Sequence, residues 1–186
     1  MAEKEGGLVI RRFADEDRLN KAFEMVKSHE GGFVNDPDDP GGATNVGITL
    51  KAYIEFCEDT GRDVPTVESL RKLTENDMMT FYGRRYFDPF MWIEDDRLFY
   101  LLCDTAVNNG RSRAILWLQR AVGLLEDGVM GPKTKTAVND AVPNDVFFRV
   151  FALRMKEYGT LPTRNPKLVK FIGGWLNRLA TFLPGV

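Results

Sequence analysis

One stretch of the sequence, HEGGFVNDPDDPGGATNVGIT at residues 29–49, places a glutamate shortly before a loop of aspartates, glycines and prolines. Glu30 comes at the end of a segment with helical periodicity, and Asp36, Asp38 and Asp39 follow in the loop. Carboxylates grouped in this way bind metal ions, stabilise turns, or act as acid and base on either side of a bond. Spacing and the neighbouring residue types distinguish these roles.

Metal binding fits this stretch poorly. An EF-hand loop that began at Asp36 would need an oxygen ligand at its fifth position and a glutamate at its twelfth, where the chain has Pro40 and Gly47. His29 begins a pattern like the zinc motif H-E-x-x-H, but the second histidine position is Phe33, and the chain contains one histidine. We therefore expect no metal site and no other cofactor.

Composition excludes several other classes of protein. Cys57 and Cys103 lie in apolar helical stretches, which favours buried free thiols over a catalytic nucleophile or a disulfide framework. The formal charge of −2 gives no basic field for nucleic acid. The N-terminus has charges where a signal peptide needs an apolar stretch, and no run of apolar residues is long enough to span a membrane. We expect a monomer.

Acid and base catalysis by paired groups remains. Hydrolysis of a glycosidic bond needs a carboxylic acid that protonates the leaving oxygen and a second group that activates water or stabilises the cationic sugar. An apolar environment raises the pKa of such an acid because it disfavours the charged form. Glu30 is the candidate acid, and Asp39 and Thr44 on the following turn are candidates for the second group. The plain alternatives are a solvent-exposed Glu30 and an Asp39 that stabilises the turn before Pro40.

The elements that must position these groups are predicted to be mainly α-helices. Asp15 or Asp17 is expected to cap a first helix that ends near residues 28–30. Residues 31–48 have no helical pattern and are predicted to form turns and a short hairpin. Thr49 is expected to cap the next helix.

Cap signals also divide the rest of the chain into helices. Thr74 and Asp77 form a capping-box pair, and Asp95 or Asp96 opens a helix that Gly110 closes. Helices are further predicted over residues 78–87 and 112–123, from Pro132, over residues 144–159, and over residues 165–183 with Asn165 as cap. The softest boundary lies near Gly110. It separates a catalytic lobe, residues 1–110, from a C-terminal helical region, residues 111–186, that is expected to pack on the lobe as one compact body.

Several motifs resemble one known family. EGGFVNDPDDPGGATNVGIT closely resembles the signature of glycoside hydrolase family 108, the N-acetylmuramidases that include phage endolysins. LLCDTAVNNG and LQRAVGLLEDGVMGPKT resemble the middle of that family, and FIGGWLNRL resembles its end. The resemblance implies a lysozyme-like, mainly α-helical fold with a small β-hairpin near residues 31–48. It also implies cleavage of the β-1,4 bond between N-acetylmuramic acid and N-acetylglucosamine, and a C-terminal region that binds peptidoglycan.

The resemblance also assigns roles to residues. The catalytic glutamate of the family opens the E-G-G motif and corresponds to Glu30. The order Glu, Asp, Thr is similar to that of T4-type phage lysozymes, which makes Asp39 and Thr44 the candidate partners, although Thr44 is one residue closer to the aspartate than in that pattern. A hairpin that folds back toward Glu30 favours a water held by Asp39, and hence inversion at the anomeric carbon.

Four further residues are candidates for substrate binding: Thr49, Asn108, Tyr86 and Trp92. Asn108 could bind an acetamido group, and its alternative role is that of a helix C-terminal asparagine before Gly110. Tyr86 and Trp92 could line the cleft, and Thr49 has helix capping as its alternative. Asp104 is predicted to be an internal hydrogen-bond anchor.

The family further implies a cellular role. We expect an endolysin that is made in the host cytoplasm without a signal peptide and reaches peptidoglycan in the periplasm after holin-type release. A muramidase that serves a secretion or particle-release system and a non-catalytic peptidoglycan-binding protein are the alternatives. The basic, amphipathic residues 164–183 could also contact an anionic membrane, although most such helices bury their apolar face.

Overall fold

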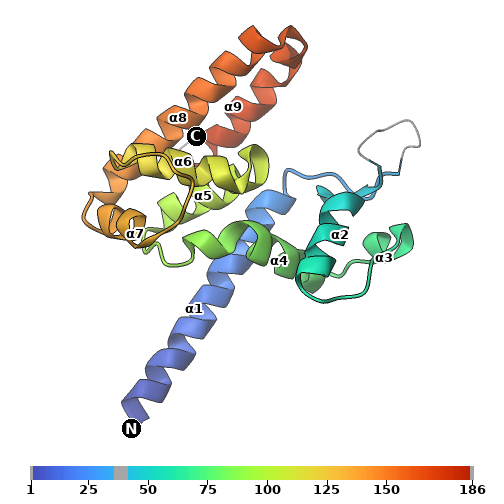
Figure 1. The fold of residues 1–186 in the computed structure, drawn as a ribbon, viewed down its shortest axis with the longest axis horizontal. Coiled ribbons are helices and arrows are strands. Elements are labelled where there is room, and N and C mark those ends of the chain that lie inside the picture. The colour runs from blue at the N-terminus through green and yellow to red at the C-terminus, as the bar shows by residue number, and fades with distance from the viewer. Residues whose placement is uncertain (1, 36–41, 185–186) are drawn as a thin grey trace. The chain divides into compact units, whose positions relative to one another are not determined.

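Figure 1 shows the computed structural model, which describes residues 2–35 and 42–184, with side chains from residue 15 onward. Asp36, Asp38 and the candidate Asp39 lie outside the described residues. The described chain is mainly α-helical with one small antiparallel sheet, as predicted.

Contacts within the chain define two compact units, residues 1–88 and residues 89–186. The assignment of a catalytic lobe to residues 1–110 and of a wall-binding region to residues 111–186 stays a prediction. Among the described residues, no helix has both the length and the apolar character needed to cross a membrane.

The first unit contains four α-helices and a hairpin among its described residues. In chain order these are α1 (Ala2–Lys27), β1 (Thr44–Asn45), β2 (Ile48–Thr49), α2 (Leu50–Asp59), α3 (Val67–Arg71) and α4 (Glu75–Tyr82). A π-helical turn, Gly83–Phe87, and a 3-10 turn, Asp88–Phe90, continue from α4. The core is aromatic and consists mainly of Phe23, Tyr53, Phe56, Phe81, Tyr82 and Phe87.

The helix α1 begins at Ala2, well before the predicted caps at Asp15 and Asp17. Residues 2–14 include seven alanine, glutamate, lysine and arginine residues, which cost little in a helix, together with the unfavourable Gly6 and Gly7, and the helix continues through both aspartates. Its end at Lys27 agrees with the prediction.

The hairpin has a very tight turn. Thr44 pairs with Thr49 and Asn45 pairs with Ile48, so Val46 and Gly47 form a loop of two residues. Both have positive φ, 47° and 70°, which is the backbone that a type I′ hairpin turn requires. An isolated bridge between Val34 and Thr44 lays the preceding segment along β1, and the predicted small β element near residues 31–48 is confirmed.

Local capping signals are confirmed in the helices that follow. The Thr49 hydroxyl accepts from the Ala52 amide at 3.2 Å, and Thr74 with Asp77 forms the predicted capping box of α4. The short helix α3 was not predicted. Its signal is a capping box between Thr66 and Ser69, with serine where glutamate or glutamine is usual.

The second unit is a helical bundle. Its described α-helices are α5 (Asp96–Asn109), α6 (Arg111–Ala121), α7 (Pro132–Asn139), α8 (Pro143–Arg164) and α9 (Ile172–Ala180). Asp95 caps α5, and Gly110 ends it with φ of 92°. The long helices α8 and α9 pack side by side (Figure 1).

Three further predicted helices differ in extent. The helix predicted over residues 78–87 begins earlier, at Glu75, and ends at Tyr82, where a π-helical turn continues the chain. The helix α8 continues past the expected end at Gly159 to Arg164, because Tyr158 and Pro162 are buried by tertiary packing. The expected single helix over residues 165–183 consists of a 3-10 segment, Pro166–Phe171, followed by α9. Asn165 precedes a proline and has an extended backbone. Its side chain accepts from the Lys167 amide and caps the 3-10 segment, which precedes α9.

A buried ionic cluster joins α5, α8 and α9. The Asp104 carboxylate lies 2.6 Å from a guanidinium nitrogen of Arg154 and 2.6 Å from one of Arg178. Arg154 has no exposed surface, and it also donates to the hydroxyls of Tyr158 and Thr105 at 2.7 and 3.3 Å. The prediction that Asp104 is an internal anchor is confirmed.

Candidate active site

Glu30 lies just beyond the end of α1, in a turn that tightens the helix terminus. Its amide donates to the Lys27 carbonyl at 3.1 Å, and the His29 amide donates to the Val26 carbonyl at 3.0 Å. Gly31 and Gly32 follow and end the helical pattern. The Glu30 side chain is half-buried, and Lys27 forms an ion pair with Glu75 that ties this end of α1 to α4.

The turn of the hairpin lies directly against the Glu30 carboxyl group. A Cβ atom added at Gly47 would stand 2.6 Å from Glu30 Oε2, 2.9 Å from its Cδ and 2.9 Å from the Tyr82 hydroxyl oxygen. These separations are shorter than any ordinary contact, so a side chain at this position would have to displace the ends of the Glu30 and Tyr82 side chains. The hairpin therefore limits where the carboxyl group can lie.

Tyr82 holds this turn in place. Its hydroxyl donates to the Val46 carbonyl at 2.7 Å, and its ring lies 5.8 Å from the ring of Phe23 on α1. Tyr82 is 1% exposed, so the hydrogen bond is shielded from water. One buried tyrosine on α4 thus connects α1, whose end leads into Glu30, with the hairpin that lies against the Glu30 carboxyl group.

The two threonine candidates lie on the hairpin as cross-strand partners, so their side chains share one face of the ribbon. Thr44 donates weakly to the Gly42 carbonyl, at 3.4 Å. The Thr49 hydroxyl caps α2, which is its structural alternative. Their catalytic and binding roles stay predictions, as does that of Asp39.

Of the four substrate-binding candidates, Tyr86 and Thr49 belong to the first unit, and Trp92 and Asn108 belong to the second. The half-buried Tyr86 ring lies 5.8 Å from the ring of Tyr82 and so borders the aromatic core next to the Glu30 site. Trp92 donates to the Pro89 carbonyl at 2.7 Å. The exposed Asn108 side chain donates to the Asp104 carbonyl at 2.7 Å, within α5. Contacts of these residues with substrate stay predictions.

Three residues that position the site were not predicted: Gly47, Tyr82 and Asn45. The buried Asn45 side chain donates to the Leu70 carbonyl at 2.8 Å and so joins the hairpin to the end of α3. A glycine between short β-forming segments is a recognisable turn signal, which could have identified Gly47. The contacts of Tyr82 and Asn45 reach 36 and 25 residues along the chain, where local sequence signals carry no information.

Comparison with known proteins defines the class. The sequence model of glycosyl hydrolase family 108 matches residues 23–110, which include Glu30 and the hairpin, and a predicted peptidoglycan domain matches residues 113–180. The chain belongs to glycosyl hydrolase family 108. It is a glycoside hydrolase, and the match to a peptidoglycan domain supports peptidoglycan as its ligand.

A particular relative is known among solved structures. The structure of Brucella abortus SagA is 30% identical in sequence, with a TM-score of 0.70, and the similarity covers 90% of this chain and 92% of that one. No curated protein matches the sequence.

Replacing Gly47 with alanine is expected to reduce hydrolysis of cell walls at least about tenfold, because misplacement of a catalytic group by ~1 Å can cost as much as 10²-fold. The new methyl group would displace the Glu30 carboxyl, and alanine is strained at φ of 70°. Clearing of a cell-wall suspension measures the activity, and urea unfolding measures the loss of stability that the strain causes.

Gly61→Ala is the matched control. Gly61 has a similar φ of 66°, but an added Cβ meets nothing within 4 Å, so this variant carries the strain without the collision. We expect it to be less stable and still active under conditions in which it is folded. Equal losses of activity in the two folded variants would contradict the role given to Gly47.

Proposed function

We propose that the protein is a muramidase that hydrolyses the β-1,4 bond between N-acetylmuramic acid and N-acetylglucosamine in peptidoglycan, with Glu30 as the general acid. The observation that carries this proposal is the Glu30 carboxyl group held against Gly47 in the region matched by the hydrolase family. The match to a peptidoglycan domain supports the choice of polymer.

The arrangement suits a general acid. A group that transfers a proton must keep its carboxyl at hydrogen-bond distance from the leaving oxygen while the bond breaks. Contact with the hairpin backbone restricts the rotation of Glu30, and the bond from Tyr82 to Val46 restrains the hairpin in turn. A non-catalytic wall-binding protein would have no need for a carboxyl group positioned in this way.

The products of digestion test the proposal. After borohydride reduction of digested peptidoglycan, we expect mass spectrometry to find the new reducing ends on muramic acid. New ends on glucosamine would indicate a glucosaminidase instead. Release of free peptides without new reducing ends would indicate an amidase, and both outcomes contradict the proposal.

The stereochemistry follows from the second group. We propose that Asp39, aided by the Thr44 hydroxyl, holds the attacking water, which gives inversion and an α-anomer as the first product. An inverting enzyme separates its two carboxyl groups by roughly 6.5–9.5 Å, and a retaining enzyme by about 5–5.5 Å. Proton NMR at early times distinguishes the anomers. If the β-anomer forms first, Asp39 becomes a candidate nucleophile.

We propose an endolysin role, with synthesis in a host cytoplasm and action in the periplasm after holin-type release. The alternative is a muramidase that serves a secretion or particle-release system, with the same chemistry. A holin gene beside the coding gene supports the first role, and a secretion operon supports the second.

Contact with an anionic membrane is a further proposal for the C-terminal segment. Val169, Phe171 and Leu176 are exposed apolar residues there, and Lys167 and Lys170 are exposed basic ones. Apolar and basic residues together suit an anionic lipid surface.

A further inference from the structure

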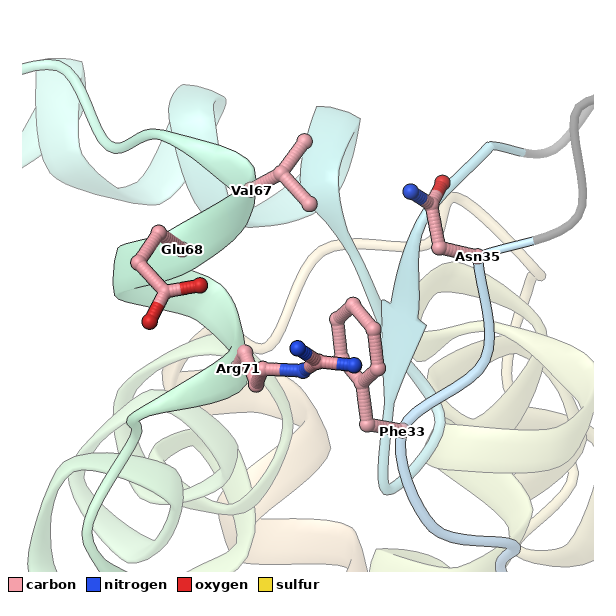
Figure 2. A pocket seen from close by; sticks show the side chains of 5 residues that line it. All are labelled: Phe33, Asn35, Val67, Glu68 and Arg71. Carbon is pink, nitrogen blue, oxygen red and sulfur yellow. The ribbon is translucent and has the colours of Figure 1, made fainter.

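A pocket of about 300 Å³ lies in the first unit, between the segment that follows Glu30 and the helix α3. It is lined by Phe33, Asn35, Val67, Glu68 and Arg71. Figure 2 shows Val67 and Glu68 on one side, Asn35 on the other, and the Arg71 side chain reaching across toward the ring of Phe33. The guanidinium carbon of Arg71 is 4.6 Å from the centre of that ring.

The Arg71 guanidinium beside Phe33 can donate hydrogen bonds to a ligand. Within the part of the chain that the structure describes, no side chain accepts a hydrogen bond from Arg71, and no carboxylate forms an ion pair with it. A guanidinium carries five N–H donors in a planar fork that matches a carboxylate. Contact with the Phe33 ring restrains the guanidinium, which lowers the entropic cost of binding.

The charge around the pocket favours an anion. The Glu68 carboxylate lies 3.0 Å from the Lys72 ammonium, and this hydrogen bond lowers the pKa of Glu68 below its ordinary value, so the pair remains ionised at neutral pH. Arg71 also attracts the Glu68 carboxylate, so Arg71, Lys72 and Glu68 together leave one net positive charge at the pocket.

The pocket is tied to the Glu30 site by short connections. Phe33 is three residues beyond Glu30, which limits the distance between their Cα atoms to about 11 Å. Asn45 donates to the Leu70 carbonyl at 2.8 Å and to the Arg71 carbonyl at 3.4 Å, so the hairpin holds the end of α3. The same hairpin contacts the Glu30 carboxyl through Gly47. Arg71 and Glu30 therefore lie on one connected framework.

We propose that this pocket, the Arg71 subsite, binds a carboxylate of the peptide stem attached to muramic acid. The inference rests on the proposed muramidase function, which supplies the substrate. In peptidoglycan the stem leaves from the lactyl group of muramic acid, one of the two sugars joined by the bond to be cut. A stem that extends from the Glu30 site over Phe33 brings its carboxylates to Arg71, and its alanine methyl groups meet the exposed apolar surface of Val67.

Binding to the inactive full-length chain tests the subsite. In the Glu30→Gln background, calorimetry compares a soluble disaccharide–tripeptide with the same fragment after its carboxylates are converted to amides. Arg71→Gln is expected to weaken binding of the unmodified fragment about tenfold, as for a hydrogen-bonded charge at an exposed site, and to leave binding of the amidated fragment unchanged.

Arg62→Gln is the matched control, because Arg62 is also exposed and its guanidinium lies 5.4 Å from the ring of Phe56, outside the pocket. We expect no change in binding for this variant. Equal losses in both variants would show a general effect of charge and overturn the subsite. No loss for Arg71→Gln, or equal loss with the amidated fragment, would overturn it as well.

Hydrolysis by the protein with Glu30 intact tests this inference separately from the proposed function. With intact glycan strands, Arg71→Gln is expected to raise KM about tenfold with kcat nearly unchanged. With strands whose stems have been removed by an amidase, which leaves the lactyl carboxylate free, it should have no effect. If Arg71→Gln still raises KM on these strands, the pocket binds the lactyl carboxylate, and the proposal that it binds the peptide stem is wrong. If the unmodified protein leaves both kinds of strand uncut, the muramidase function itself is wrong.

Discussion

Glu30→Gln is expected to reduce the hydrolysis of peptidoglycan by roughly 10²–10⁴-fold, the usual contribution of a general acid. Glutamine has nearly the size of glutamate, so the contact with Gly47 and the fold around it should remain. The proton that the leaving oxygen needs is absent, because an amide does not supply it. We therefore expect the activity to fall while the thermal midpoint, followed by circular dichroism, changes little.

Glu58→Gln is the control for this experiment, since Glu58 is an exposed glutamate on α2 in the same unit. It should retain full activity and the same thermal midpoint. A folded Glu30→Gln protein that keeps more than about a tenth of the activity would contradict the role of general acid, because that contribution is at least about 10²-fold.

Asp104→Asn is expected to lower the free energy of unfolding of the second unit by about 3–5 kcal/mol, the typical cost of removing one member of a buried ion pair. Asp104 is 2% exposed and serves two arginines at once, of which Arg154 is completely buried. The substitution keeps the shape of the side chain but leaves two buried positive charges without their anion. The loss is therefore electrostatic rather than one of packing.

Tryptophan fluorescence measures this effect selectively, because Trp92, Trp117 and Trp175 all belong to residues 89–186. Urea unfolding followed by this signal should show a lower midpoint for Asp104→Asn. Asp140→Asn, which changes an exposed aspartate after α7, is expected to change the free energy of unfolding by no more than about 0.5 kcal/mol, as for most surface changes. An unchanged midpoint for Asp104→Asn would show that the cluster contributes nothing to stability.

Local signals predicted much of the secondary structure, because helix caps act over only a few residues. The side chains of Thr49, Thr74 and Asp95 each accept from an amide three residues ahead, and the Asp77 side chain accepts from the Thr74 amide in return. The early start of α1 was missed because Gly6 and Gly7 are poor helix formers and the sequence shows no cap signal near Ala2. The helix α3 was missed because five residues are too few to show a periodicity.

By itself, the sequence determined the mainly α-helical class, the hairpin after Glu30 and the family to which the chain belongs, since these depend on residue types and on spacing along the chain. Only the tertiary structure brought Gly47 against the Glu30 carboxyl, Arg71 over Phe33, and Arg154 and Arg178 onto Asp104. These contacts join residues from 17 to 74 positions apart. At such separations the packing of the aromatic core and of the helices decides which side chains meet, because no local preference of the backbone extends that far.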